Sequence, residues 1–156
     1  MSAVPAMLLD RAGIAARIPH HGSMCLLEAV LGYSEAAIEC RAVSHRDPAN
    51  PLIADGRLGA ACGIEYAAQA MAVHGALLAG TSERPRQGYL TSVRSVRLLV
   101  ERLDDLPEPL AIRAERLSGD ANHILYQFSL HHAGQLLLDG RAAVVLDAAA
   151  LQEIRP

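Results

Sequence analysis

Residues 58–78 form an apolar stretch that contains one acid, Glu65, and no arginine or lysine. Apolar residues on all sides predict a long helix buried in a core. A carboxylate in such surroundings is unfavourable unless it is paired, protonated or used in chemistry. Apolar surroundings also favour the protonated form, which suits a proton donor. Glu65 is therefore the first candidate for a functional residue.

The same stretch has the length of a membrane span, but Glu65, Gln69 and His74 interrupt it. These polar side chains favour a buried helix of a globular domain and no membrane association. Hydrophobic residues make up 51% of the chain and charged residues 20%, which is typical of a folded protein. The length of 156 residues predicts a single domain over residues 1–156.

The composition excludes several classes of function. Aromatic residues make up only 3% and the formal net charge is −3, which argues against nucleic-acid binding. All the basic residues except histidine are arginines, so neither a Schiff-base lysine nor a P-loop lysine is available. The three cysteines lack metal-ligand spacing and predict free thiols, no metal site and a reducing, cytoplasmic location.

Turn residues divide the rest of the chain into short elements. The apolar spacing within residues 7–16 predicts a short amphipathic helix, and the long helix is expected over residues 58–79. Residues 45–57 and 80–87 predict loops, and residues 148–154 a short helix or a frayed end. The predicted strands, of which the last four are expected to form an antiparallel meander, are residues 25–33, 37–44, 88–93 continuing through 96–103, 110–117, 123–132 and 135–146.

One long apolar helix combined with these strands predicts an α+β domain in which an antiparallel sheet wraps around the helix. This is the hotdog architecture. Its sheet leaves edge strands that are usually covered by association. We therefore expect a homodimer or a higher oligomer.

Two motifs resemble those of the β-hydroxyacyl-acyl carrier protein dehydratases of the hotdog superfamily. Residues 18–28, IPHHGSMCLLE, resemble the family's (L/I)PH…(M/F)xLL(D/E) opening, and residues 63–69, GIEYAAQ, resemble its (G/I)xE(Y/A)xAQ helix. The nearest branch is similar to the small hotdog 3-hydroxyacyl-carrier-protein dehydratases, some of which belong to aryl-polyene pigment pathways. Residues 44–56, SHRDPANPLIADG, depart from the family pattern. Housekeeping enzymes carry GHFPxxPxxPG there, with the catalytic histidine.

The resemblance implies dehydration of a (3R)-hydroxyacyl thioester to the trans-2-enoyl thioester. The substrate would arrive on acyl carrier protein or coenzyme A, within fatty acid or polyketide biosynthesis. The phosphopantetheine arm would come with the substrate, so no further cofactor is expected. The enzyme would be a hydro-lyase, either as a homodimer or together with a hotdog paralogue.

The resemblance also implies roles for particular residues. His20 would remove the α proton as a neutral imidazole, and Glu65 would protonate the departing hydroxyl. His45 lies where the housekeeping base lies, so the choice between His20 and His45 stays open. Gln69, four residues after Glu65, would orient Glu65 or the substrate; a polar bridge between helix and strand is its alternative reading. At Gly63, near the helix start, N–H groups would polarise the thioester carbonyl, with close packing as the alternative.

Two other functions remain compatible with these residues. An acyl-thioester hydrolase would use Glu65 to activate water. A non-catalytic partner subunit would stabilise an active hotdog paralogue, which the missing GHFP segment motivates. Arg84, Arg86, Arg94 and Arg97 can contact an acidic carrier protein or a phosphate, or form an ordinary solvated face.

Overall fold

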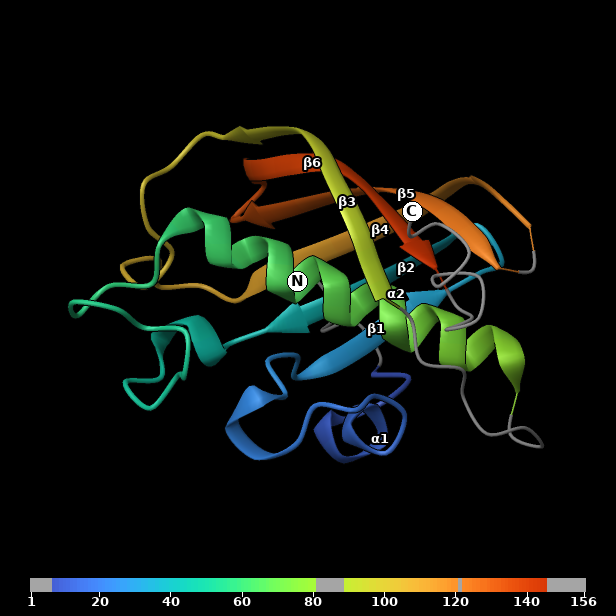
Figure 1. Cartoon of the computed structure of the whole chain (residues 1–156). Coiled ribbons are helices and arrows are strands. Elements are labelled where there is room, and N and C mark those ends of the chain that lie inside the picture. The colour runs from blue at the N-terminus through green and yellow to red at the C-terminus, as the bar shows by residue number, and fades with distance from the viewer. Residues whose placement is uncertain (1–6, 81–88, 121, 146–156) are drawn as a thin grey trace.

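The computed structural model describes residues 7–80, 89–120 and 122–145 and has one six-stranded antiparallel sheet curled around one long helix (Figure 1). The long helix is α2, Gly63–Ala79. The short helix α1, Arg11–Ala15, lies beside β1 on the outside of this assembly. The strands are β1 Ala29–Tyr33, β2 Ala37–Ala42, β3 Tyr89–Leu98, β4 Leu110–Gly119, β5 His123–His132 and β6 Gln135–Val145.

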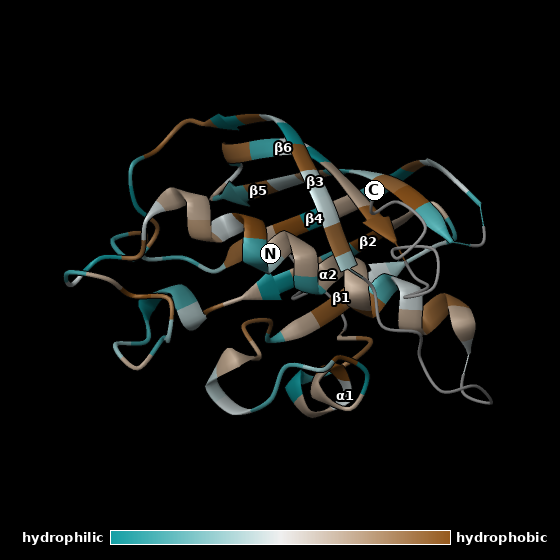
Figure 2. Cartoon of the chain, in the orientation of Figure 1, coloured by the Kyte–Doolittle hydropathy of each residue, from teal (hydrophilic) through white to brown (hydrophobic). Residues whose placement is uncertain are grey.

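The core lies between α2 and the concave face of the sheet. Hydrophobic residues recur along α2 and along the strands behind it (Figure 2). Tyr66, Ala67 and Ala70 of α2 are fully buried, as are Ile112 of β4 and Leu130 of β5. Burial of these apolar side chains is the main favourable contribution to folding, and it fixes which face of α2 is turned away from the core.

The predicted start of the long helix is wrong by five residues. Residues 58 and 59 are extended and pair with residues 101–103: Leu103 N donates to Leu58 O at 2.8 Å, and the adjacent Ala60 N donates to Glu101 O at 3.0 Å. A single 3₁₀ turn, Ala60–Cys62, then leads into α2 at Gly63. This pairing also ends β3 at Leu98 rather than at residue 103, since the backbone of residues 101–103 pairs with residues 58–60 instead of β6.

The predicted meander holds for three of its four strands. The order in the sheet is β1-β2-β4-β5-β6-β3, so β4, β5 and β6 follow one another while β3 lies beyond β6. The place expected for β3 beside β4 is taken by β2, whose Cys40 is opposite Ile112. As a result β3 forms one edge of the sheet and passes in front of α2 (Figure 1).

The N-terminal region is less helical than its apolar spacing predicts. Leu8 N donates to Val30 O at 2.8 Å, so this part of the chain pairs with β1. The helix begins only after Asp10, whose side chain accepts from Gly13 N at 2.9 Å as an N-cap. Similarly, β1 begins at Ala29 and not at residue 25, because the backbone N–H and C=O of Leu26 bond to the side chains of Gln69 and Ser44 and not to a neighbouring strand.

The predictions for residues 148–154 and for residues 81–87 of the second loop lie outside the described residues. Cys25, Cys40 and Cys62 are free thiols. No helix among the described residues is long and apolar enough to cross a membrane.

Candidate active site

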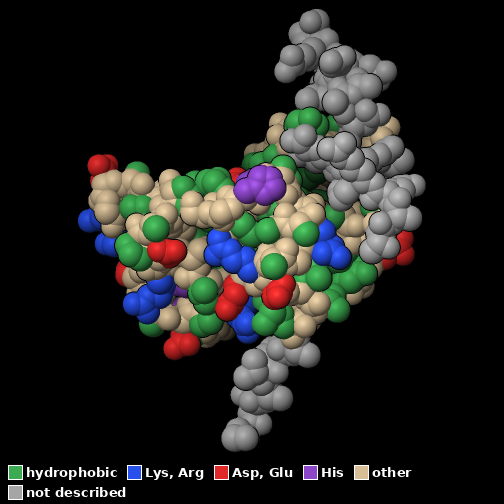
Figure 3. All heavy atoms as spheres, turned by 90° about the horizontal axis from the view of Figure 1, so that it is seen from below, with side chains coloured by type: hydrophobic (Ala, Val, Ile, Leu, Met, Phe, Trp, Pro, Cys, Tyr) green, Lys and Arg blue, Asp and Glu red, His purple; other side chains and the backbone are tan. Residues whose placement is uncertain are grey.

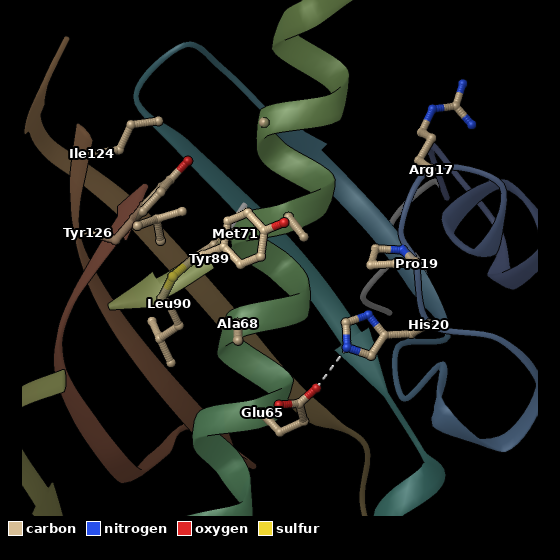
Figure 4. Close-up of a pocket in the computed structure, with 13 residues that line it drawn as sticks. Arg17, Pro19, His20, Glu65, Ala68, Met71, Tyr89, Leu90, Ile124 and Tyr126 are labelled. Carbon is tan, nitrogen blue, oxygen red and sulfur yellow. Dashed lines mark ion pairs between the residues drawn. The ribbon is translucent and has the colours of Figure 1, made fainter. Parts of the chain in front are cut away.

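His20 and Glu65 lie in contact although 45 positions separate them in the chain. His20 Nε2 is 3.0 Å from Glu65 Oε1, and the two side chains point toward each other (Figure 4). The two side chains are 28% and 34% exposed, so the pair faces the outside of the core and not its interior. His20 Nδ1 is buried and has no hydrogen-bond partner among the described residues. Nε2 is therefore the imidazole nitrogen that a substrate can reach.

Gln69 holds the segment that carries His20 against the helix that carries Glu65. Its amide nitrogen donates to Met24 O at 2.7 Å, and its amide oxygen accepts from Leu26 N at 2.9 Å. The same nitrogen lies 3.3 Å from Glu65 Oε1. Because Gln69 is fully buried, these bonds are protected from competing water. The amide thus contacts both the His20 segment and the Glu65 carboxylate.

A second chain of hydrogen bonds holds the same segment from the other side. Asn50 Nδ2 donates to the Tyr66 hydroxyl at 3.2 Å. The hydroxyls of Tyr66 and Ser44 are 2.8 Å apart, and Ser44 Oγ donates to Leu26 O at 2.7 Å. The Ser44 hydrogen is used on Leu26, so Tyr66 donates to Ser44. Burial raises the pKa of the Tyr66 phenol, which keeps this donor protonated.

An apolar cavity of about 330 Å³ begins at the His20–Glu65 pair. The floor is one face of α2, and the walls come from the sheet on one side and the N-terminal segment on the other (Figure 4). A cavity that is mainly apolar with a few polar groups at one place is the usual form of a small-molecule site. Its lining residues on α2 are Glu65, Ala68, Met71, Ala72 and Gly75, and those on the sheet are Tyr89, Leu90, Ile124, Tyr126 and Val144.

Two other predicted site residues lie away from this cavity. Gly63 is buried against the sheet, where an added Cβ would lie 2.8 Å from Leu138 Cδ2, so close packing accounts for the glycine. His45 is buried, and its Nε2 donates to Leu106 O at 2.9 Å. Burial lowers the pKa of His45. The structure brings together His20, Glu65 and Gln69, but not Gly63 or His45.

His74, on the same helix, is fully buried and hydrogen-bonded on both nitrogens. Its Nε2 is 2.7 Å from Ser34 O, and because a carbonyl only accepts, Nε2 carries the hydrogen. Nδ1 then accepts from the Tyr126 hydroxyl at 2.7 Å. Burial lowers the pKa of His74 and raises that of Tyr126 to about 12. Both groups are therefore neutral at physiological pH.

The remaining lining residues of the cavity were not among the residues predicted from the sequence. On α2 the signal was available, since Ala68, Ala72 and Gly75 follow Glu65 at helical spacing. No comparable signal exists for Leu90, because only the order of the strands brings β3 to the front of α2.

Charged residues of both signs are interspersed on the face formed by the N-terminal segment (Figure 3). Of the four arginines considered for carrier-protein contact, Arg84 and Arg86 lie outside the described residues. Arg97 is hydrogen-bonded to Asp139, with Nε 3.0 Å from Oδ1. No group of three or more metal-ligating side chains occurs in residues 7–80, 89–120 and 122–145.

Comparison with known proteins adds independent information. A family model described as ApeP-like, ApeP dehydratase, matches residues 12–154. No curated protein matches the chain.

Several solved structures share the fold. The dehydratase heterocomplex ApeI:P from Xenorhabdus doucetiae has a chain that is 24% identical, with a TM-score of 0.76 over 92% of this chain and 97% of that chain. Zebra fish thioesterase superfamily member 2 is 17% identical, with a TM-score of 0.60 over 89% and 99%. A putative thioesterase from Silicibacter is 14% identical, with a TM-score of 0.58 over 92% and 95%. These likenesses confirm the predicted hotdog fold.

Proposed function

Because this chain belongs to the ApeP-like dehydratase family, we propose that it removes water from a (3R)-3-hydroxyacyl thioester to give the trans-2-enoyl thioester. The observation that carries the proposal is the contact of 3.0 Å between His20 Nε2 and Glu65 Oε1 at one end of an apolar cavity. A base and an acid side by side match the two proton transfers of this reaction. The apolar lining matches an acyl chain.

In the proposed reaction His20 Nε2 takes the proton from the α carbon. The electron pair of that C–H bond forms the α–β double bond as the β C–O bond breaks. Glu65 gives its proton to the departing hydroxyl, which leaves as water. Since His20 and Glu65 approach from the same side, both transfers occur on one face of the substrate.

The contact between the two residues also supports a simple return to the starting state. After water has left, His20 carries an extra proton and Glu65 lacks one. The two atoms are within hydrogen-bond distance, so the proton passes directly from the imidazolium to the carboxylate. Gln69 has a positioning role here, because its amide contacts Glu65 as well as the segment that carries His20.

We further propose that the substrate arrives on acyl carrier protein and that the chain works in an assembly with a second hotdog chain. β3 pairs with β6 and with no other described strand, so its outer edge is available for pairing. The similar structure from Xenorhabdus is described as a heterocomplex. A measurement of molar mass by light scattering, for the chain alone and mixed with a hotdog paralogue, distinguishes a homodimer from a mixed assembly.

The deciding experiment follows the acyl mass of a 3-hydroxyacyl carrier-protein thioester during incubation with the protein. Wild type is expected to produce a loss of one water, and Glu65→Gln and His20→Ala are expected to abolish it. His45→Ala should retain it, because His45 lies outside the cavity and is already bonded to Leu106. If His45→Ala abolishes water loss while His20→Ala does not, His45 is the base.

Hydrolysis is the second candidate, because a carboxylate that is 34% exposed beside a cavity can also activate water. The same mass measurement distinguishes the two reactions. Release of a free acid without an enoyl product identifies a thioester hydrolase. If the thioester stays intact when this protein is mixed with an inactive hotdog paralogue, both reactions are contradicted. If activity appears only when an active paralogue is present, this protein is a partner subunit.

A further inference from the structure

The cavity continues along α2 well beyond the His20–Glu65 pair. Gly75 lines it ten positions after Glu65 on the same helix. With a rise of about 1.5 Å per residue, the two positions are separated by roughly 15 Å along the helix axis. Ala68, Met71 and Ala72 lie between them and also line the cavity. The floor of the cavity is therefore a continuous apolar surface.

The sheet wall of the cavity is also apolar and is fixed in position. Tyr126 lines it and is 1% exposed. Its hydroxyl is bonded to His74, which is held in turn by the carbonyl of Ser34. Ile124 and Leu90 lie on the same side (Figure 4). A wall in which the polar atoms already have partners suits an acyl tail better than a pantetheine arm, whose amides would need hydrogen-bond partners.

Of the α2 residues that line the cavity, Gly75 alone has no side chain. Packing within the described residues does not require a glycine at this position. A Cβ built on Gly75 meets no atom within 4 Å. By contrast, a Cβ on Gly63 would collide with Leu138. Glycine in the interior of a helix is less favourable than alanine. A glycine at position 75 therefore needs another explanation, namely that the space beside it stays empty of side-chain atoms. The cavity supplies that explanation.

We propose that Gly75 sets the length of the acyl chain that this protein accepts, and this inference rests on the acyl-thioester function proposed above. With the reacting carbons at His20 and Glu65, the acyl tail runs along α2 toward Gly75. An extended chain advances roughly 1.3 Å for each C–C bond of about 1.5 Å. The distance of about 15 Å then corresponds to roughly ten to twelve bonds. The substrates are medium-chain acyl thioesters. A side chain at position 75 would reduce the greatest acyl-chain length that the cavity accepts.

The test compares Gly75→Ala and Gly75→Leu with wild type on 3-hydroxyacyl thioesters from four to fourteen carbons. Ala79→Leu is the matched control, because it adds the same side chain at an exposed position of the same helix. We expect kcat/KM for the four-carbon substrate to change by less than about twofold in both Gly75 variants. For Gly75→Leu we expect kcat/KM of the longest substrates to fall by at least about tenfold, since a few methylenes in an apolar pocket are worth about this much.

Gly75→Ala is expected to be at least as stable as wild type, because alanine favours the helix, and to show a smaller fall for the longest chains. An equal loss at all chain lengths in Gly75→Leu, or no loss at any length, would overturn the inference. The same change of profile in Ala79→Leu would also overturn it, since position 79 does not line the cavity.

A binding measurement separates this inference from the proposed reaction. Saturated acyl thioesters of the same lengths cannot be dehydrated, and calorimetric titration reports their affinity directly. If wild type catalyses no dehydration but its affinity rises with chain length and Gly75→Leu cancels this rise, the reaction assignment fails and the role of Gly75 stands. If affinity does not depend on chain length in wild type, the role of Gly75 is wrong even if dehydration occurs.

Discussion

Two histidines, His20 packed against α2 and His74 within it, have opposite environments. His20 contacts Glu65 at 3.0 Å, is 28% exposed and borders the cavity. His74 is fully buried, donates to Ser34 O and accepts from the Tyr126 hydroxyl. His20 thus has one imidazole nitrogen at the edge of the cavity, next to the carboxyl group of Glu65. His74 has both nitrogens occupied by neutral partners.

These two environments indicate which histidine can take part in proton transfer. A general base must reach its substrate through a nitrogen that can gain and lose a proton. His74 cannot do this without breaking a buried hydrogen bond, which leaves a polar group without a partner. His20 Nε2 needs only to exchange Glu65 for a substrate. The environment, and not the residue type, separates the histidine that we propose as the base from the structural one.

Substitution of Glu65, the partner of His20, should reduce activity more than any other change considered below. Glu65→Gln keeps the shape of the side chain and removes the transferable proton. We expect kcat to fall by about 10³-fold, within the usual range for loss of general acid catalysis, with the melting temperature preserved. Glu39→Gln is the control, because Glu39 pairs with Arg113 on the surface and should retain full activity. Equal activity of the two variants would contradict the assignment of Glu65.

The next effect tests the His74 side. His74→Ala removes a buried ring and leaves Ser34 O and the Tyr126 hydroxyl without partners. We expect unfolding in urea to show a loss of about 3 kcal/mol. The kcat per folded molecule on a four-carbon substrate should stay within a few-fold of wild type. A stable but inactive His74 variant would contradict a purely structural role, since it would make His74 part of the chemistry.

The hotdog fold could be predicted because the apolar helix and the strand pattern allow few packing solutions. The match to the ApeP-like family confirms the predicted resemblance to an aryl-polyene type hotdog dehydratase. The order of the strands could not be predicted, since local patterns do not show that β2 takes the place beside β4. The helix start was misjudged because the pairing of residues 58–60 with residues 101–103 is non-local.

Of the candidate site, the individual residues were easier to predict than their arrangement. His20, Glu65 and Gln69 were recognised from two motifs, and the structure brings them together. The sequence could not show that His20 borders the cavity while His45 is directed toward Leu106, because the contact of His45 is with a distant loop. The assignment of His20 as the base stays a prediction. The sheet side of the cavity also needed coordinates, since Leu90 and Ile124 come from strands that the sequence alone does not place beside α2.

A third variant, with a smaller expected effect, tests what holds His20 in place. Gln69→Leu removes the bonds to Met24 and Leu26 and keeps a similar volume. We expect kcat to fall by about 10- to 100-fold, because small misplacements of catalytic groups have effects of this size. The effect on KM should be smaller, since Gln69 does not line the cavity. A change in KM alone would assign Gln69 to substrate binding instead.

The smallest effect is the dependence of stability on pH. Burial lowers the pKa of His74 below the ordinary value of 6.5. The unfolded chain therefore binds protons that the folded chain does not, and stability falls as the pH drops below 6.5. The loss is at most about 1.4 kcal/mol per pH unit for such a group. Urea unfolding between pH 7.5 and 5.5 measures it, and the slope should be smaller in His74→Gln.

The side chains of Gln69 and Ser44 connect the two parts of the molecule that form the candidate site, namely the segment with His20 and the helix with Glu65. Residues 19–24, which carry His20, are at least partly exposed and lie between the buried side chains of Ile18 and Leu26, and side-chain bonds to the backbone at Met24 and Leu26 hold them on the helix with Glu65. Such a segment can separate from the rest in a local opening that needs less free energy than global unfolding. Enzymatic activity should then disappear at a lower denaturant concentration than the helical circular dichroism signal. Activity therefore reports on the attachment of this segment, while the spectrum reports on the sheet and the helix that remain.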